Sequence, residues 1–167
     1  GFGKGVRAPE ARRWKTRNAR SYLWAGEGKG AAQCAWSAAL GSEAAPDGPG
    51  FTSVACLYGL KKAFEYVTPQ LLWKRGLEHG FPAPLLAWLI SLYTGPRYPM
   101  YTSVVQAEPL GPRRGAPAGS RFADLALRIV LITPFDLYIQ RWPSSNLSVY
   151  IDDLTTQYYG RLSPIKG

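Results

Sequence analysis

Two adjacent carboxylates, Asp152 and Asp153, stand between two apolar runs near the end of the chain. The run 147–151 alternates and is rich in β-formers, which predicts a strand, and residues 154–159 predict the return strand. Acids at such a junction can hold divalent metal ions against a phosphate chain. Because neighbouring strand residues point to opposite faces, we expect the two acids to have different roles. On this segment alone a plain polar hairpin turn competes with that interpretation.

The composition predicts one folded, basic domain with a polyanionic partner. The 167 residues are 46% hydrophobic, which allows a sizeable core and excludes a disordered chain. Lys and Arg number 20 against 11 Asp and Glu, giving a net charge of +9. Such an excess favours nucleic acid or an anionic membrane surface as partner, with a merely soluble basic domain as the alternative.

The cysteines and the histidine argue against several kinds of site. Cys34 and Cys56 form no zinc-binding pattern and predict two reduced thiols in an intracellular protein. The single histidine, His79, is expected to end a helix, which leaves hydrolase triads and histidine metal sites without support. No run is apolar enough to span a membrane, and no secretory signal is apparent, so we expect neither a membrane nor a secreted protein. Both ends indicate a fragment of something longer.

The pattern of apolar residues, Pro and Gly predicts an α+β fold, an antiparallel sheet with helices packed on one face. Residues 31–40 are helix-prone, and Ser120 is expected to N-cap a long helix that is interrupted near Pro134. The other expected elements are a loop at 41–50, a buried strand at 51–57 ending at 58–59, helices at 69–79 and 82–93, an edge strand at 100–106 and a loop at 111–119.

Three motifs, taken in order, resemble the palm of reverse transcriptases of the retrotransposon or group II intron type. They are residues 57–67 (LYGLKKAFEYV), residues 114–120 (RGAPAGS) and residues 150–153 (YIDD). The intervening helical run 71–93 and the upstream segment 24–31 (WAGEGKGA) are also similar to that family. The resemblance implies partial fingers with a basic arm at 1–50, a palm at 51–160 and a truncated end at 161–167.

The resemblance also implies the chemistry: two-metal polymerisation of dNTP on an RNA template and a DNA primer, with Mg²⁺ or Mn²⁺. Asp152 would be the main metal ligand and Asp153 a supporting one. Phe64 would lie under the sugar of the incoming nucleotide and favour deoxynucleotides, unless it is an ordinary core aromatic. The nucleotide-binding loop would include Pro117, Gly119 and Ser120, with Gly115 shaping it by close backbone approach.

Departures from the family pattern predict a damaged enzyme. Gly59 stands where the family has the aspartate that bridges both metals, Ala118 replaces a glutamine that contacts the nucleotide, and nothing matches the later palm segments or the thumb. Three alternatives remain. One is a non-catalytic nucleic-acid-binding module. A second is an RNA-dependent RNA polymerase palm, ranked low because of Ile151 and Phe64. The third is an unrelated basic α+β domain.

Overall fold

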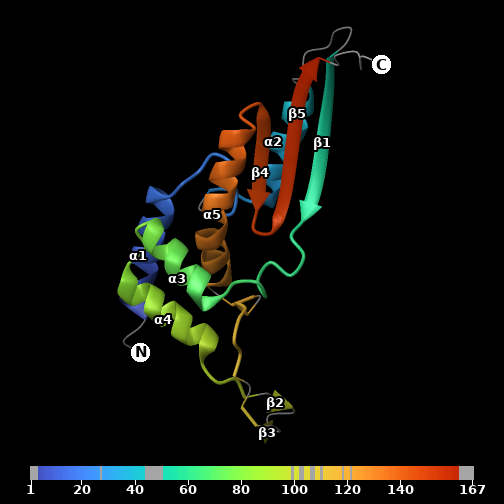
Figure 1. The fold of residues 1–167 in the computed structure, drawn as a ribbon. Coiled ribbons are helices and arrows are strands. Elements are labelled where there is room, and N and C mark those ends of the chain that lie inside the picture. Colours follow the sequence, from blue (N-terminus) through green and yellow to red (C-terminus); the bar gives the residue numbers. More distant parts are fainter. Residues whose placement is uncertain are drawn as a thin grey trace. The chain divides into compact units, whose positions relative to one another are not determined.

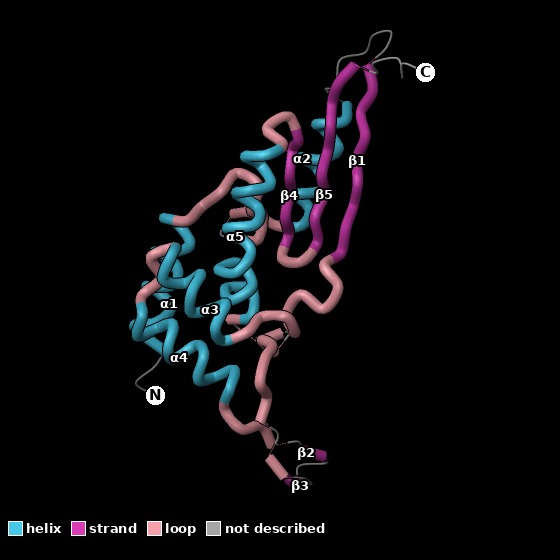
Figure 2. The backbone as a smooth tube through the Cα atoms, in the orientation of Figure 1, coloured by secondary structure: helices cyan, strands magenta, loops and turns pink. Residues whose placement is uncertain are grey.

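The computed structural model confirms a mixed α+β fold (Figures 1 and 2). It describes residues 4–26, 28–43, 51–98, 100–101, 104–105, 108–109, 111–117, 119–120 and 122–161. None of the helices in this described part is both long and apolar enough to cross a membrane. The elements are α1 (Lys4–Arg17), α2 (Ala31–Glu43), β1 (Phe51–Gly59), α3 (Pro69–Glu78), α4 (Ala83–Thr94), β2 (Met100–Tyr101), β3 (Val104–Val105), α5 (Ala123–Arg141), β4 (Ser145–Tyr150) and β5 (Asp153–Arg161).

The chain divides into two compact units, each described by itself. Unit 1 consists of residues 1–18 and 62–133, and unit 2 of residues 19–61 and 134–167. Helix α5 is continuous through Pro134, so the predicted interruption is wrong. A proline removes one helical hydrogen bond, and burial of Ile132 and Phe135 on either side offsets that loss. The division into fingers and palm stays a prediction.

Unit 2 is built on a three-stranded antiparallel sheet with the order β1-β5-β4 (Figure 1). Strand β5 lies in the middle and pairs along its whole length with β1. On the far side of β4, the segment around Leu23 adds a parallel bridge at Val149. Two hydrogen bonds fix it: the Val149 N–H donates to the Tyr22 carbonyl (2.8 Å) and the Trp24 N–H to the Val149 carbonyl (2.9 Å).

Helices contact both faces of this sheet, not one face as the sequence predicts. The Gln157 side chain donates to the Ala38 carbonyl of α2 (2.6 Å), whereas Tyr158 hydrogen-bonds through its hydroxyl to Tyr138 of α5. Adjacent strand residues point to opposite faces, so the two helices lie on opposite sides. Burial of both Leu147 and Ser148 in β4 agrees, because a strand covered on one face only would alternate in burial.

Strand β1 is an edge strand and is largely exposed, which corrects the expectation of a buried strand. Leu57 is 79% exposed and Tyr58 53% exposed. The reason is topological: in the described part of the chain β5 is its only partner, and α2 contacts β4 and β5. An apolar run of β-formers indicates a strand, but it does not reveal whether anything covers that strand.

Unit 1 contains the helical pair that the sequence predicts at 69–79 and 82–93. Thr68 caps α3, its hydroxyl accepting from the Leu71 N–H (3.2 Å), and Pro69 occupies the first turn. Helix α4 packs on α3, where Gly76 leaves room for Leu86, which is fully buried. The expected edge strand at 100–106 is instead two paired two-residue strands, β2 and β3. Residues 102, 103 and 106 of that range, and 44–50 of the predicted loop 41–50, lie outside the described residues.

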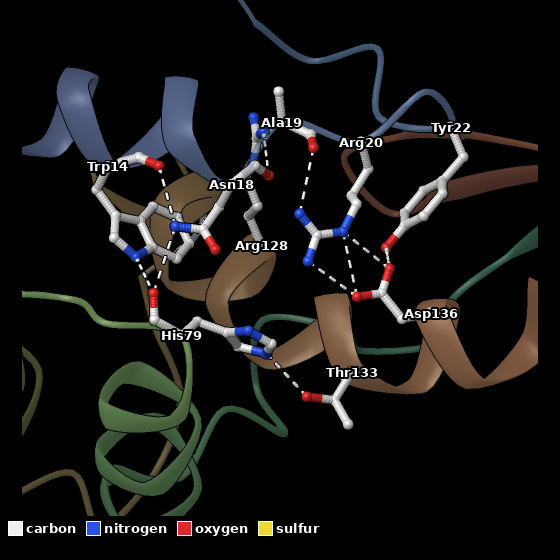
Figure 3. Close-up of polar contacts among 9 residues, drawn as sticks. All are labelled: Trp14, Asn18, Ala19, Arg20, Tyr22, His79, Arg128, Thr133 and Asp136. Atoms are coloured by element: carbon white, nitrogen blue, oxygen red, sulfur yellow. Dashed lines mark hydrogen bonds and ion pairs between the residues drawn. The ribbon is translucent and has the colours of Figure 1, made fainter.

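Each unit contains a cluster of side-chain hydrogen bonds that join residues far apart in the sequence (Figure 3). In unit 2 the Asp136 carboxylate accepts from the Arg20 Nε (3.0 Å) and from the Tyr22 hydroxyl (2.6 Å), and the hydrogen bond to Asp136 raises the pKa of Arg20. In unit 1, His79 follows α3 as its C-cap, as the sequence predicts. Its carbonyl accepts from the Trp14 Nε1 (2.8 Å), and its ring Nε2 lies 2.8 Å from the Thr133 hydroxyl.

Candidate metal and nucleotide site

The hairpin that carries the two acids turns one residue earlier than the sequence predicts. Tyr150 pairs with Asp153, so Ile151 and Asp152 form a two-residue turn and Asp153 is the first residue of β5. Both possible turns, 151–152 and 152–153, are two residues long, so the pairing register of β4 with β5, and not the loop length, places Ile151 in the turn. Asp152 therefore lies at the tip and Asp153 in the sheet, and the two acids differ in position as expected.

Gly59 lies directly beside these acids. It is the register partner of Asp153 at the end of β1, and residues opposite each other in a sheet share a face. The next residue, Leu60, donates its N–H to the Asp152 carbonyl (3.0 Å), which ties the end of β1 to the turn. A Cβ added at Gly59 would meet no atom within 4 Å. The position of the missing carboxylate is thus adjacent to the hairpin acids and open.

The three residues Gly59, Asp152 and Asp153 lie in a region that is open to solvent. Asp152 is half-buried and Asp153 exposed. Tyr58, beside Gly59, is also exposed, and a hydrogen bond with Cys56 raises the pKa of its hydroxyl. Tyr58 therefore stays protonated at neutral pH and adds no anionic oxygen.

The donor set does not fit a pair of bridged metal ions. Mg²⁺ is usually held by one or two carboxylates together with water and substrate phosphates. Asp152 and Asp153 offer two carboxylates, but Gly59 has no side chain to bridge a second ion. Within the described ranges no group of three or more His, Cys, Asp and Glu residues gathers. The hairpin suits one hard cation at most.

Ile151, between Tyr150 and Asp152, has a strained backbone. Its φ is +59°, in the left-handed region that a β-branched residue rarely adopts. The first central position of a two-residue hairpin with positive φ is usually glycine. Such strain costs about 1–3 kcal/mol and clusters at functional sites. Isoleucine is thus an unfavourable residue for an ordinary turn at this position.

We expect Ile151→Gly to be more stable than Ile151→Ala by about 1 kcal/mol, because both lack the side chain and only glycine adopts positive φ without cost. Urea denaturation measures the difference in the free energy of unfolding. Ala55, exposed on β1 without positive φ, is the matched control: there Ala55→Gly should destabilise by about 0.5–1 kcal/mol. An Ile151→Ala variant at least as stable as Ile151→Gly would disprove the strain.

A second group of predicted residues gathers in unit 1. The Gly115 N–H donates to the Val67 carbonyl and the Ala116 N–H to the Phe64 carbonyl, both at 2.8 Å. These bonds fasten the loop of the second motif to the segment that follows the first motif. Val67 and Ala116 are buried, whereas Phe64 is only half-buried, so part of its surface is open for contact with a ligand.

The other residues predicted for nucleotide binding lie further along the same loop. Pro117 is half-buried, and its carbonyl accepts from the Ser120 N–H (3.0 Å). Gly119 has φ +80°, a conformation that favours glycine. The predicted side-chain N-cap at Ser120 is wrong, because α5 begins at Ala123 and the buried Ser120 hydroxyl has no hydrogen-bond partner among the described residues. Ala118 and Arg121 lie outside the described residues.

We expect Gly115→Ala to destabilise the chain by about 1–3 kcal/mol. Gly115 has φ +94°, and an added Cβ would lie 3.3 Å from the Cα of Glu65, so strain and crowding act together. Gly111→Ala is the control, because Gly111 has no positive φ and a Cβ there meets nothing within 4 Å. Guanidinium denaturation should place this control within about 0.5 kcal/mol of wild type; equal effects at both positions would contradict the prediction.

The predicted site residues therefore fall into two groups. The structure brings Gly59, Asp152 and Asp153 together in unit 2, and it ties Phe64 to the loop that contains Pro117, Gly119 and Ser120 in unit 1. Sequence reasoning missed Tyr66, whose ring lies under the guanidinium of Arg114. The available signal was an aromatic residue in a basic segment. A scan against models of known families and a search of curated proteins each found no match.

Proposed function

We propose that this chain is the fingers and palm part of a reverse transcriptase whose polymerase chemistry is disabled by the glycine at position 59. The observation that carries the proposal is the pairing of Gly59 with Asp153. The residue that replaces the expected bridging aspartate lies next to the hairpin acids on one face of one sheet. If the YIDD turn were a chance match, the strand of the first motif (residues 57–67) would have no reason to end beside Asp153.

Two further features support the proposal. The turn residue Ile151 retains a strained backbone, which an ordinary connection would lose. Within unit 1, the loop of the second motif is hydrogen-bonded to the segment of the first motif that contains Phe64, so these two parts are adjacent in space as well as ordered in sequence. RNA template, DNA primer and dNTP are the proposed ligands, and Mg²⁺ or Mn²⁺ the proposed metal.

The role of each residue follows from its position. Asp152 at the tip of the hairpin holds a divalent cation, and Asp153 supports it from the first position of β5. Phe64 packs against the sugar and rejects a 2′-hydroxyl by its bulk. Without a carboxylate at position 59, the chain cannot hold a second ion beside the first.

Calorimetry tests this assignment, and Gly59→Asp should bind Mn²⁺ at least tenfold more tightly than the wild-type chain. A third carboxylate joins the two on the hairpin, and each added anionic oxygen ligand strengthens the attraction for a hard divalent cation. The open space at Gly59 lets the side chain enter without displacing a neighbour.

Gly160→Asp is the matched control. Gly160 is also exposed and open to a Cβ, but it pairs with Thr52 at the opposite end of β1. This variant carries the same added charge away from the hairpin and should bind Mn²⁺ as wild type does. Equal affinities for the two variants would show that Gly59 is not a vacant ligand position and would remove the alignment on which the proposal depends.

A non-catalytic nucleic-acid-binding module is the second candidate, favoured by the distribution of charge. Residues 1–18 and 62–133 hold 14 of the 20 basic residues and 5 of the 11 acidic ones, so unit 1 carries the whole net charge of +9, and unit 2, with six of each, is neutral. Binding that weakens steeply with salt supports this candidate. It is compatible with descent from a polymerase.

A further inference from the structure

We propose that Tyr66 and Arg114 form a stacking site for an unpaired base, through which unit 1 binds single-stranded nucleic acid without any metal ion. Tyr66 is 58% exposed, and the guanidinium of Arg114 lies 5.4 Å from the centre of its ring. An exposed aromatic ring paired with an arginine offers both a π-face and a cation to a nucleotide.

The site is held in place by the backbone beneath it. The Tyr66 N–H donates to the Lys62 carbonyl (3.2 Å), and the Gly115 N–H, next to Arg114, donates to the Val67 carbonyl (2.8 Å). Val67, which follows Tyr66, and Ala116, which follows Gly115, are both buried. The ring and the guanidinium therefore come from two segments that are fixed to each other, so little conformational entropy is lost when a base stacks on them.

The charge around this pair suits a phosphate chain. Lys62 and Arg113 are exposed in the segments 62–66 and 113–114, which contain Tyr66 and Arg114. Glu65 is the one acidic residue of these two segments. In the described part of the chain, Arg114 forms no ion pair, so its charge is available to a phosphate. The net positive charge of unit 1 also makes this unit more favourable than unit 2 for binding a polyanion.

The chemistry favours a single strand over a duplex. A base can stack on Tyr66 only when it is not already stacked between neighbours in a helix. Stacking is tolerant of sequence because every base has a π-face, so the expected ligand is RNA or DNA without sequence preference. This inference does not depend on the proposed polymerase ancestry, since it uses none of Gly59, Asp152 and Asp153.

Fluorescence anisotropy with a labelled 12-mer of deoxythymidine, in 50 mM salt and EDTA, tests the site on the whole 167-residue chain. We expect Tyr66→Leu to weaken binding about tenfold without changing its salt dependence, and Tyr66→Trp to restore it, because removing one stacked base–ring pair costs about five- to a hundredfold. Arg114→Ala should weaken binding and also lower the slope of log affinity against log salt by about 0.7, the value for one phosphate contact on a single strand.

The control is Tyr98→Leu, because Tyr98 is an equally exposed tyrosine of unit 1 at 57% exposure. Circular dichroism checks that each variant is folded. The inference is overturned if the wild-type chain does not bind the 12-mer, if Tyr66→Leu binds as wild type, if Tyr98→Leu loses as much, or if a duplex of the same length binds more tightly. None of these outcomes bears on Mn²⁺ binding by Gly59→Asp, so the two proposals fail separately.

Discussion

The Gly59→Asp variant should incorporate dTTP opposite a poly(rA) template on the order of a thousand times faster than the wild-type chain, for which we expect no detectable incorporation. A carboxylate that bridges two metals stabilises the charge of the phosphoryl-transfer transition state by several kcal/mol, and each 1.4 kcal/mol corresponds to a factor of ten in rate. Adding this one carboxylate at the end of β1 should therefore change the rate more than a substitution within the hairpin.

The local structure explains why the substitution can succeed. Gly59 ends β1 opposite Asp153, on the same face, and an added Cβ meets no atom within 4 Å. The end of β1 is fixed to the turn by the hydrogen bond from Leu60 to Asp152. The new carboxylate enters a prepared position, so the gain should come from chemistry and not from refolding of the hairpin.

Two further variants separate this effect from its alternatives. Gly59→Asn has nearly the same shape without the charge and should stay inactive. Gly59→Asp combined with Asp152→Asn should lose the gain, because the bridging carboxylate then has no partner. A Gly59→Asp chain that binds Mn²⁺ tightly and still incorporates nothing would show that the glycine at position 59 is not by itself what disables polymerisation.

Local patterns predicted the elements of the candidate site well. Alternation of β-formers indicated the strands of the hairpin, and Pro69 with Gly80 indicated the bounds of α3. The exact turn was missed because the competing choices differ by one residue and both give a two-residue connection, so the pairing register of β4 with β5 decides between them. That position 59 lies near the hairpin acids was expected only through the family resemblance, and its pairing with Asp153 was not predicted, since no local pattern fixes a register between strands so far apart in sequence.

Features that depend on distant partners could not be predicted. Nothing near Arg20 or Tyr22 in sequence indicates that both bind the carboxylate of Asp136. Burial failed for the same reason: the composition of β1 is that of a core strand, yet its exposure depends on what lies beside it in space. Sequence periodicity reports the local backbone, whereas covering a strand and pairing a buried hydroxyl are properties of the tertiary fold.

Trp14→Ala should lower the free energy of unfolding by about 3–5 kcal/mol, the range for truncating a fully buried large aromatic residue. Trp14 has no exposed surface, and its ring packs edge-on against Phe81 with the ring centres 5.2 Å apart. Its Nε1 also donates to the His79 carbonyl, as Figure 3 shows. Among the α1 side chains whose burial is described, only Ala11 and Trp14 are buried, and Trp14 is much the larger, so we expect it to anchor α1 to the rest of unit 1.

Two further variants divide the loss between packing and hydrogen bonding. Trp14→Phe keeps an aromatic ring against Phe81 and should lose only about 1–2 kcal/mol, since the His79 carbonyl still accepts from the Asn18 amide (3.3 Å). Trp36→Ala, at a tryptophan of α2 that is 67% exposed, should change stability by less than about 0.5 kcal/mol. Guanidinium denaturation followed by far-ultraviolet circular dichroism measures all three. If Trp14→Ala and Trp36→Ala unfold at the same denaturant concentration, Trp14 does not anchor α1.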